Sequence, residues 1–561
     1  MKKILCTAIL LIIMALPTLV MAQNASPYPE WSGYDKLIRE IKAETNFAER
    51  AKLMHQAEDM LMETGAIIPI FYYNDTYLQS SKISGIYCTF DSSKFFYYAN
   101  KEGENTLRVN IGPEPDYLDP ALGSSLEKGL LTTNSFSGLY EYNAEGILAP
   151  MLAEGYELSE DGLTYTFTLK DGLKWSDGSD LTAQDFVYSW KRAADARTGC
   201  EYSYMFDVIA GYEEAQNGSP DALQVSAPDE RTLVVTLNAP CAYFLDLAAF
   251  TTYKPVKQSE VEAYADWETN PGHWAQEAGF VTNGPYTLES WDHDVSMVYV
   301  RNPYWFDADN VSIERIEYML SDDESSVYAA YRAGDLDFAD YVPSDEIKTL
   351  LESGDPEFYV IGQLATYYVM FNVKSALFDG KTAEQANAMR QAFSKLIDRE
   401  YIIDTVGQTG QEIATSFIPS GMADGNGGIF KDAEAWDYPV EDGYYGTDVD
   451  TEGAIALLKF AGFEFDENGK LSAATPIRFE YVTNTSVTNQ EIAECIQMDL
   501  AEVGIEMTIR TVQQSILLDE KRSGHYDIAS AGWWVDFNDP INMLEIYTTN
   551  SGNNGAQFGR Y

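Results

Sequence analysis

One stretch near the end of the chain, residues 531–540, places two carboxylates among bulky aromatic side chains. Asp539 followed by Pro540 is typical of a helix start and predicts a helix over 541–547. This gives Asp539 a structural role but leaves Asp536, three residues earlier, without one. A carboxylate among aromatic rings is costly to desolvate unless a cation compensates it. Asp536 is therefore either a binding group for a cationic ligand or an ordinary turn residue, and the local sequence leaves both interpretations open.

Motifs for catalysis and metal binding are missing from the sequence. It contains no Gly-x-Ser-x-Gly, His-Glu-x-x-His or P-loop pattern. Asp and Glu number 88, so some pair falls at glycosidase spacing by chance. No Cys-x-x-Cys pair occurs, and the histidines are scattered at positions 55, 273, 293 and 525. We therefore expect a protein that is not an enzyme and that holds no metal or other cofactor.

The overall charge narrows the possible partners. The 561 residues carry a formal net charge of −51, which repels phosphate backbones and argues against a nucleic-acid partner. This charge either favours cationic ligands or serves solubility alone. The hydrophobic content of 45% is that of a globular protein.

The first 22 residues resemble a secretory leader. Two lysines precede an apolar run, and Val20-Met21-Ala22 fits a cleavage site. No other run approaches the 18 apolar residues of a membrane helix, and Cys6 lacks a lipoprotein context. We expect a periplasmic or secreted protein. Its four remaining cysteines allow three disulfide pairings if all are bridged, and the sequence leaves the pairing open: Cys88, Cys200, Cys241 and Cys495.

Hydrophobic periodicity predicts a mixed α/β protein. Asn46 and Glu49 form a capping box for a helix that is followed by a buried strand over 67–73. Residues 163–169 alternate between apolar and polar, as in a strand with one buried face. Helical and extended patterns then alternate through residue 503, which is typical of an α/β fold.

Several motifs together resemble a known family. They are YDKLI at 34–38, AERAKL at 48–53, IIPIFYY at 67–73, TLRVNIGPEPDYLDP at 106–120, NGPY at 283–286, RNPYW at 301–305 and YYVMFN at 367–372. The chain resembles the extracellular solute-binding proteins of family 5, in particular the oligopeptide-binding proteins of ABC importers. The resemblance implies two α/β lobes of the class II periplasmic-binding-protein type, joined by two crossover strands, with an extra domain inserted in the first lobe.

The order of these motifs differs from the family's order. In the family, motifs like those at 27–99 close the chain, and a segment like 106–120 begins it. We therefore predict a circular permutation, with a gene rearrangement or an exchange of 26–99 between two copies as alternatives. The predicted parts are a leader (1–22), lobe 1 (72–137 and 263–371), its inserted domain (138–262) and lobe 2 (26–71 and 372–561).

The resemblance also implies a binding site. Asp536 matches an aspartate that pairs with the α-ammonium of a peptide, and Trp533 matches a tryptophan that packs beside the peptide, with Trp534 next to it in the site. Tyr202 matches a ligand-contacting tyrosine of the inserted domain. A further set matches a strand whose backbone groups face the ligand: Thr366, Tyr367 and Tyr368. Ser530 stands where some relatives have an arginine, so the recognition of the peptide's carboxylate is left undetermined.

The function implied by the resemblance is capture of oligopeptides and delivery to an ABC permease by a monomeric binding protein. Three alternatives stay open. The same fold could take a nickel chelate, an oligosaccharide or another small solute. The protein could be an exported hydrolase that uses paired carboxylates. Finally, it could serve in sensing instead of transport.

Overall fold

A ten-stranded sheet forms the framework of the protein. The computed structural model describes residues 26–123, 125–432 and 444–561, so the predicted leader lies outside the described residues. The strand order is β13-β14-β15-β6-β16-β1-β17-β20-β18-β19. Their bounds are Ile67–Gln79 (β1), Thr106–Asn110 (β6), Tyr286–Asp292 (β13), Ser296–Arg301 (β14), Arg315–Met319 (β15), Phe338–Ala339 (β16), Phe358–Phe371 (β17), Arg478–Thr483 (β18), Glu506–Thr511 (β19) and Ile528–Trp534 (β20).

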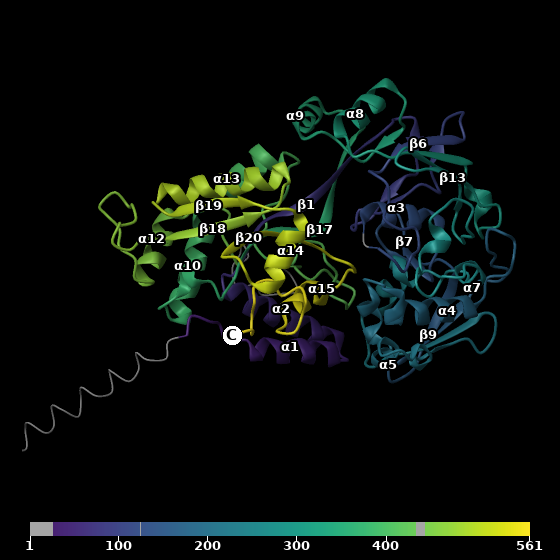
Figure 1. Cartoon of the computed structure of the whole chain (residues 1–561), viewed down its shortest axis with the longest axis horizontal. Helices are drawn as coiled ribbons and strands as arrows, with labels where there is room; N and C mark the ends of the chain where they lie inside the picture. The colour runs from purple at the N-terminus through teal and green to yellow at the C-terminus, as the bar shows by residue number, and fades with distance from the viewer. Residues whose placement is uncertain (1–25, 124, 433–443) are drawn as a thin grey trace, which may run out of the picture.

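The two longest strands, β1 and β17, join two groups of elements. They pair in antiparallel fashion along most of their length, from Ile67 opposite Met370 to Leu78 opposite Phe358. Figure 1 shows β18, β19 and β20 on one side of this pair and β6 and β13 on the other. This arrangement confirms the predicted α/β fold class. The predicted lobe boundaries at 71/72 and 371/372 fall within β1 and at the end of β17.

The segments predicted as lobe 1 contain helices and short ribbons in addition to their strands. They are α3 (Leu126–Ser135), α8 (Glu324–Ala333), α9 (Ser344–Ser353), β2 (Ile83–Ser84), β3 (Tyr87–Cys88), β4 (Lys94–Phe95) and β5 (Asn100–Lys101). The predicted inserted domain contains β7 (Tyr140–Tyr142), β8 (Leu148–Pro150), β9 (Ala153–Leu158), β10 (Thr164–Leu169), β11 (Val225–Ser226), β12 (Thr232–Thr236), α4 (Ala183–Ala194), α5 (Tyr212–Gln216), α6 (Phe244–Ala249) and α7 (Gln258–Val261). The alternation expected for 163–169 is present in β10, where Tyr165, Phe167 and Leu169 are buried.

The segments predicted as lobe 2 come mainly from the second half of the chain. Its helices there are α10 (Ala383–Leu396), α11 (Arg399–Ile402), α12 (Thr451–Phe460), α13 (Val487–Glu502), α14 (Gln514–Ser523) and α15 (Ile541–Leu544). The helix predicted over 541–547 is α15 followed by one 3₁₀ turn. Asp539 accepts a hydrogen bond from the backbone N–H of Ile541 at 3.0 Å and forms a buried ion pair with Arg50 at 2.7 Å.

The first described residues pack against the last ones. The helices α1 (Ser32–Ala43) and α2 (Phe47–Glu63) lie beside the C-terminus in Figure 1. The indole N–H of Trp31 donates to the carbonyl oxygen of Tyr547 at 2.9 Å, and its ring stacks on Phe558 at 4.0 Å. The rings of Tyr28 and Tyr561 stack at 4.5 Å. The two ends of the described chain are therefore neighbours in space.

Two local expectations need comment. Asn46 caps α2 by accepting from the backbone N–H of Ala48 and Glu49, but the backbone N–H of Asn46 donates to Glu44 and not to Glu49. The predicted capping box is thus only half formed. The four cysteines left open for pairing are all free thiols. Within the described residues, no helix has the length and apolar content needed to cross a bilayer.

Candidate ligand-binding cleft

A cavity of about 520 Å³ is lined by residues from the segments predicted as the two lobes, the inserted domain and the crossing strands. Lobe 1 contributes residues around Ser92 and the first turn of α3, and the inserted domain contributes Tyr202, Phe250 and Thr251. Strands β1 and β17 supply the floor. Lobe 2 supplies Trp534, Val535 and Asp536 from the end of β20 and the loop after it. Strand β20 pairs with β17, and this pairing places the loop after β20 at the cavity.

Asp536 is a carboxylate held without a cation. Its Oδ2 accepts from the Tyr204 hydroxyl at 3.0 Å and from Asn542 Nδ2 at 3.2 Å. Its backbone N–H donates to Asn542 Oδ1 at 3.1 Å, which fixes the loop. Burial raises the pKa of Asp536 above the ordinary aspartate value, although both side-chain hydrogen bonds lower it. Among the described residues no Lys, Arg or His forms an ion pair with it, so its charge is uncompensated.

Two tyrosines of the predicted inserted domain lie near the carboxylate of Asp536. Tyr202, which the sequence predicted, lines the cavity, and its ring lies 5.0 Å from that of Phe250. Tyr204 was missed as a site residue, yet its hydroxyl makes the direct contact with Asp536 across the lobes. The only sequence signal for Tyr204 is its position two residues after Tyr202. Tyr204 lies in a short 3₁₀ segment, Ser203–Val208, and Tyr202 is the residue that precedes it.

The two tryptophans have separate positions. Trp534 lines the cavity, is 48% exposed, and its ring lies 4.1 Å from that of Tyr73. Trp533 lines another cavity of about 460 Å³, together with Tyr204. Its indole N–H donates to Asn542 Oδ1 at 3.0 Å, the same oxygen that binds the backbone of Asp536. Adjacent residues of a strand point to opposite faces, so only one of the pair can wall the main cavity.

Thr366, Tyr367 and Tyr368 lie in the core and do not line the cavity. At these three residues β17 pairs with β1 on one side and with β20 on the other, so this part of the strand offers no free edge to a ligand in this conformation. Thr366 Oγ1 donates to the carbonyl oxygen of Phe417 at 2.8 Å. The expectation that these three residues present their backbone to a ligand is corrected accordingly, because neighbouring strands already use it.

Gln363, earlier in β17, is the residue of this strand that lines the cavity. Its side chain is 5% exposed, and its Oε1 accepts from the Ser92 hydroxyl at 2.9 Å. Its Nε2 has no hydrogen-bond partner among the described residues. A buried amide without an acceptor is unfavourable, so Gln363 is suited to donate to an oxygen atom of a ligand. Sequence reasoning did not single it out.

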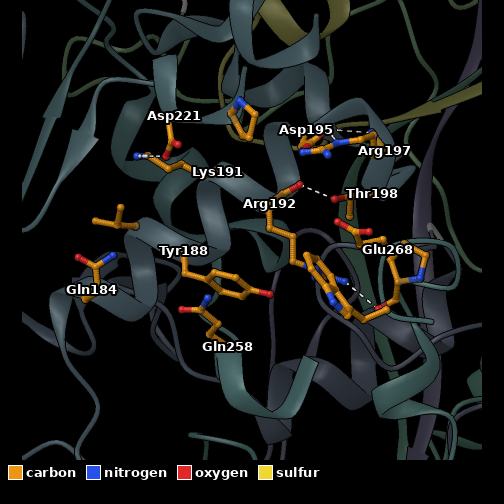
Figure 2. Close-up of a pocket in the computed structure, with 14 residues that line it drawn as sticks. Gln184, Tyr188, Lys191, Arg192, Asp195, Arg197, Thr198, Asp221, Gln258 and Glu268 are labelled. Atoms are coloured by element: carbon orange, nitrogen blue, oxygen red, sulfur yellow. Dashed lines mark hydrogen bonds and ion pairs between the residues drawn. The ribbon is translucent and has the colours of Figure 1, made fainter. Parts of the chain in front are cut away.

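A third cavity, of about 300 Å³, lies beside α4 of the predicted inserted domain (Figure 2). Tyr188 and Trp267 form part of its wall. In contrast to the cleft, every cation that lines it is paired with a carboxylate. These pairs are Lys191 with Asp221 at 3.0 Å, Arg192 with Asp119 at 2.6 Å, and Arg197 with Asp195 at 2.9 Å.

Comparison with known proteins identifies the fold and the family. The sequence model of the bacterial extracellular solute-binding proteins, family 5, matches residues 148–555. The chain belongs to this family. Family 5 consists of binding proteins, not enzymes, and its members are extracellular or periplasmic.

Several relatives of the chain carry names that describe peptide binding. The oligopeptide-binding protein OppA of Bacillus subtilis is 32% identical over 467 residues, which cover 81% of this chain and 79% of OppA. The solved structure of the Escherichia coli murein tripeptide-binding protein MppA superposes with a TM-score of 0.64 at 27% identity, covering 81% of this chain and 84% of MppA. Haemophilus influenzae OppA in complex with the peptide RPPGFSPFR gives a TM-score of 0.61 at 28% identity, covering 82% and 85%.

Proposed function

We propose that this protein captures peptides in the cleft between its lobes and delivers them to the permease of an ABC importer. The observation that carries the proposal is the uncompensated carboxylate of Asp536 in an aromatic-walled cavity. A peptide's α-ammonium is a cation that would neutralise this charge and donate hydrogen bonds to it. The names of the relatives, which include oligopeptide- and tripeptide-binding proteins, support the same ligand class.

Lobe closure is the proposed mechanism. Tyr204 of the inserted domain donates to Asp536 of lobe 2, so this contact exists only when the two parts approach each other. A ligand that contacts both sides favours the closed state to the extent that these contacts are absent from the open state. Tyr202 and Trp534 would wall the ligand, and Gln363 would donate to it. The protein would act as an exported monomer after removal of residues 1–22.

A mass spectrum of the protein purified under native conditions tests the ligand class, followed by calorimetry with a randomised tripeptide library. We expect co-purified peptides and micromolar or tighter binding of the library, without cleavage products. A co-purified oligosaccharide or metal chelate, together with no binding of peptides, would overturn the proposal and favour a non-peptide solute. Hydrolysed peptides would favour the hydrolase instead.

A further inference from the structure

Lys128 is a buried cation on the lobe 1 side of the same cavity. It lies in the first turn of α3, is 3% exposed and is among the cavity-lining residues. Its ammonium donates to the carbonyl oxygens of Pro120 at 2.9 Å and Gly123 at 3.5 Å. No third acceptor and no carboxylate lies within bonding distance of Nζ in the part of the chain that the structure describes. An ammonium has three N–H groups, so one is left for another partner.

The charge of Lys128 is poorly compensated where it lies. Burial lowers its pKa to about 8, and the nearby cation of Lys254 adds to this effect. Asp119 and, more weakly, Asp116 oppose the shift, but the carboxylate of Asp119 is already paired with Arg192 at 2.6 Å. A buried lysine with this environment is stabilised by any anion that enters the cavity.

We infer that Lys128 binds the α-carboxylate of a short peptide whose α-ammonium is bound by Asp536. The inference rests on the proposed function and adds the recognition of the other end of the ligand. The two groups lie on opposite lobes and line one cavity, so a single zwitterionic ligand would neutralise both. At Ser530, the hydroxyl is 3.0 Å from that of Thr483 and the residue is buried, so it is not available for this role.

The size of the cavity limits the length of such a ligand. A sphere of 520 Å³ is about 10 Å across, and an extended peptide rises about 3.4 Å per residue, which corresponds to roughly three residues. A longer peptide would carry its carboxylate beyond Lys128. Recognition by Lys128 therefore predicts a preference for short peptides with a free C-terminus.

The experiment compares a randomised tripeptide library with its C-terminal amide, by calorimetry, in the wild type and in Lys128→Met. We expect the wild type to bind the free acid at least about tenfold more tightly than the amide, as for a hydrogen bond to a charged group. In Lys128→Met this ratio should fall to about one. The ratio compares two ligands on one protein, so a partly unfolded variant does not change it.

Lys191→Met is the matched control, because Lys191 lines the paired cavity of the inserted domain and is bound to Asp221. It should keep the wild-type ratio. A wild type that binds the acid and the amide equally, or a Lys128→Met variant that keeps the preference, would overturn the inference while leaving peptide binding intact. Failure of the wild type to bind either library would instead overturn the proposed function.

A series of free-acid libraries of two to six residues adds the length dependence. The loss of affinity in Lys128→Met should be at least about tenfold for peptides of two to four residues. For five and six residues it should be within about twofold. An equal loss at every length would show that Lys128 acts only by holding the turn at Pro120 and Gly123, and would contradict the inference.

Discussion

The cavity of the inserted domain and the cavity between the lobes use charge in opposite ways. In the inserted domain, Lys191, Arg192 and Arg197 each have a carboxylate partner within the protein. In the cleft, Asp536 and Lys128 come from opposite lobes and neither forms an ion pair within the described residues. Charges that neutralise each other serve the folded state, whereas charges left uncompensated in a cavity destabilise the empty protein and favour a complementary ligand.

The largest expected effect is a loss of stability when an ion pair of the cavity beside α4 is broken. Arg192→Met leaves Asp119, which is 0% exposed, as a buried carboxylate without its cation. We expect a loss of about 3–5 kcal/mol in the free energy of unfolding, measured by urea denaturation. A stable variant with weakened peptide binding would reverse the roles assigned to the two cavities.

Asp536→Asn should weaken peptide binding without unfolding the protein. It retains the shape of the side chain but removes the charge that binds the ammonium, and we expect peptide affinity to fall by about 2–5 kcal/mol, measured by calorimetry. Asp221→Asn is the matched control, since this carboxylate belongs to the paired cavity and is largely exposed. Equal affinities of Asp536→Asn and the wild type would contradict the binding role.

Acid should weaken peptide binding by protonating Asp536. Because burial raises its pKa, the carboxylate becomes neutral at a higher pH than an ordinary aspartate, and affinity falls as pH drops through that raised value. The ligand's own carboxyl titrates lower, at about 3.3–3.7. Affinity measured from pH 7 to pH 4 should decline in the wild type and stay flat in Asp536→Asn until the ligand itself titrates. A parallel decline in both proteins would mean that a group other than Asp536 causes the pH dependence of peptide affinity.

The ligand-free protein should be stabilised by the same Asp536→Asn change. A carboxyl whose pKa is raised in the folded state binds more protons there than in the unfolded chain, so stability falls as pH rises through the raised pKa. Above that pH the charged group is a net cost. We therefore expect Asp536→Asn to have a higher thermal midpoint than the wild type at pH 7 without peptide. A lower midpoint would mean that the charge supports the fold.

The smallest effect is expected from restoring the family's segment order. The predicted permutation requires chain ends that lie close together, and the ring of Tyr28 stacks on that of Tyr561 at 4.5 Å. A rearranged chain with the leader, then 106–561, then 26–105 should bind peptides within about twofold of the wild type, because few contacts are broken at exposed joints. Light scattering should give a monomer for both chains. A dimer of the wild-type chain would favour exchange of the segment 26–99 between two copies.

The sequence predicted the features that depend on local pattern. The alternation in β10 follows from nearest neighbours and is present in the structure. The helix predicted after Asp539 also forms, although Pro540 and not Asp539 stands at its N-cap position. The family resemblance identified the α/β fold and assigned Asp536, Tyr202 and Trp534 to one site on the strength of their motifs. These three residues do line one cavity.

Other features depend on contacts between distant segments. The sequence of β17 does not reveal that both its edges are taken, so Thr366, Tyr367 and Tyr368 were expected to face a ligand. Lys128 and Gln363 resemble ordinary surface residues in sequence. Their burial results from packing between elements that are far apart in the sequence, so the neighbouring residues in the sequence do not indicate it.

The most direct test of the account is a four-way calorimetric comparison of the tripeptide library and its N-acetylated form, on the wild type and on Asp536→Asn. If the uncompensated carboxylate binds the α-ammonium, acetylation weakens binding to the wild type by about 2–5 kcal/mol and to Asp536→Asn by close to nothing. An equal loss on both proteins would contradict the account, because the ammonium would then be recognised by some other group.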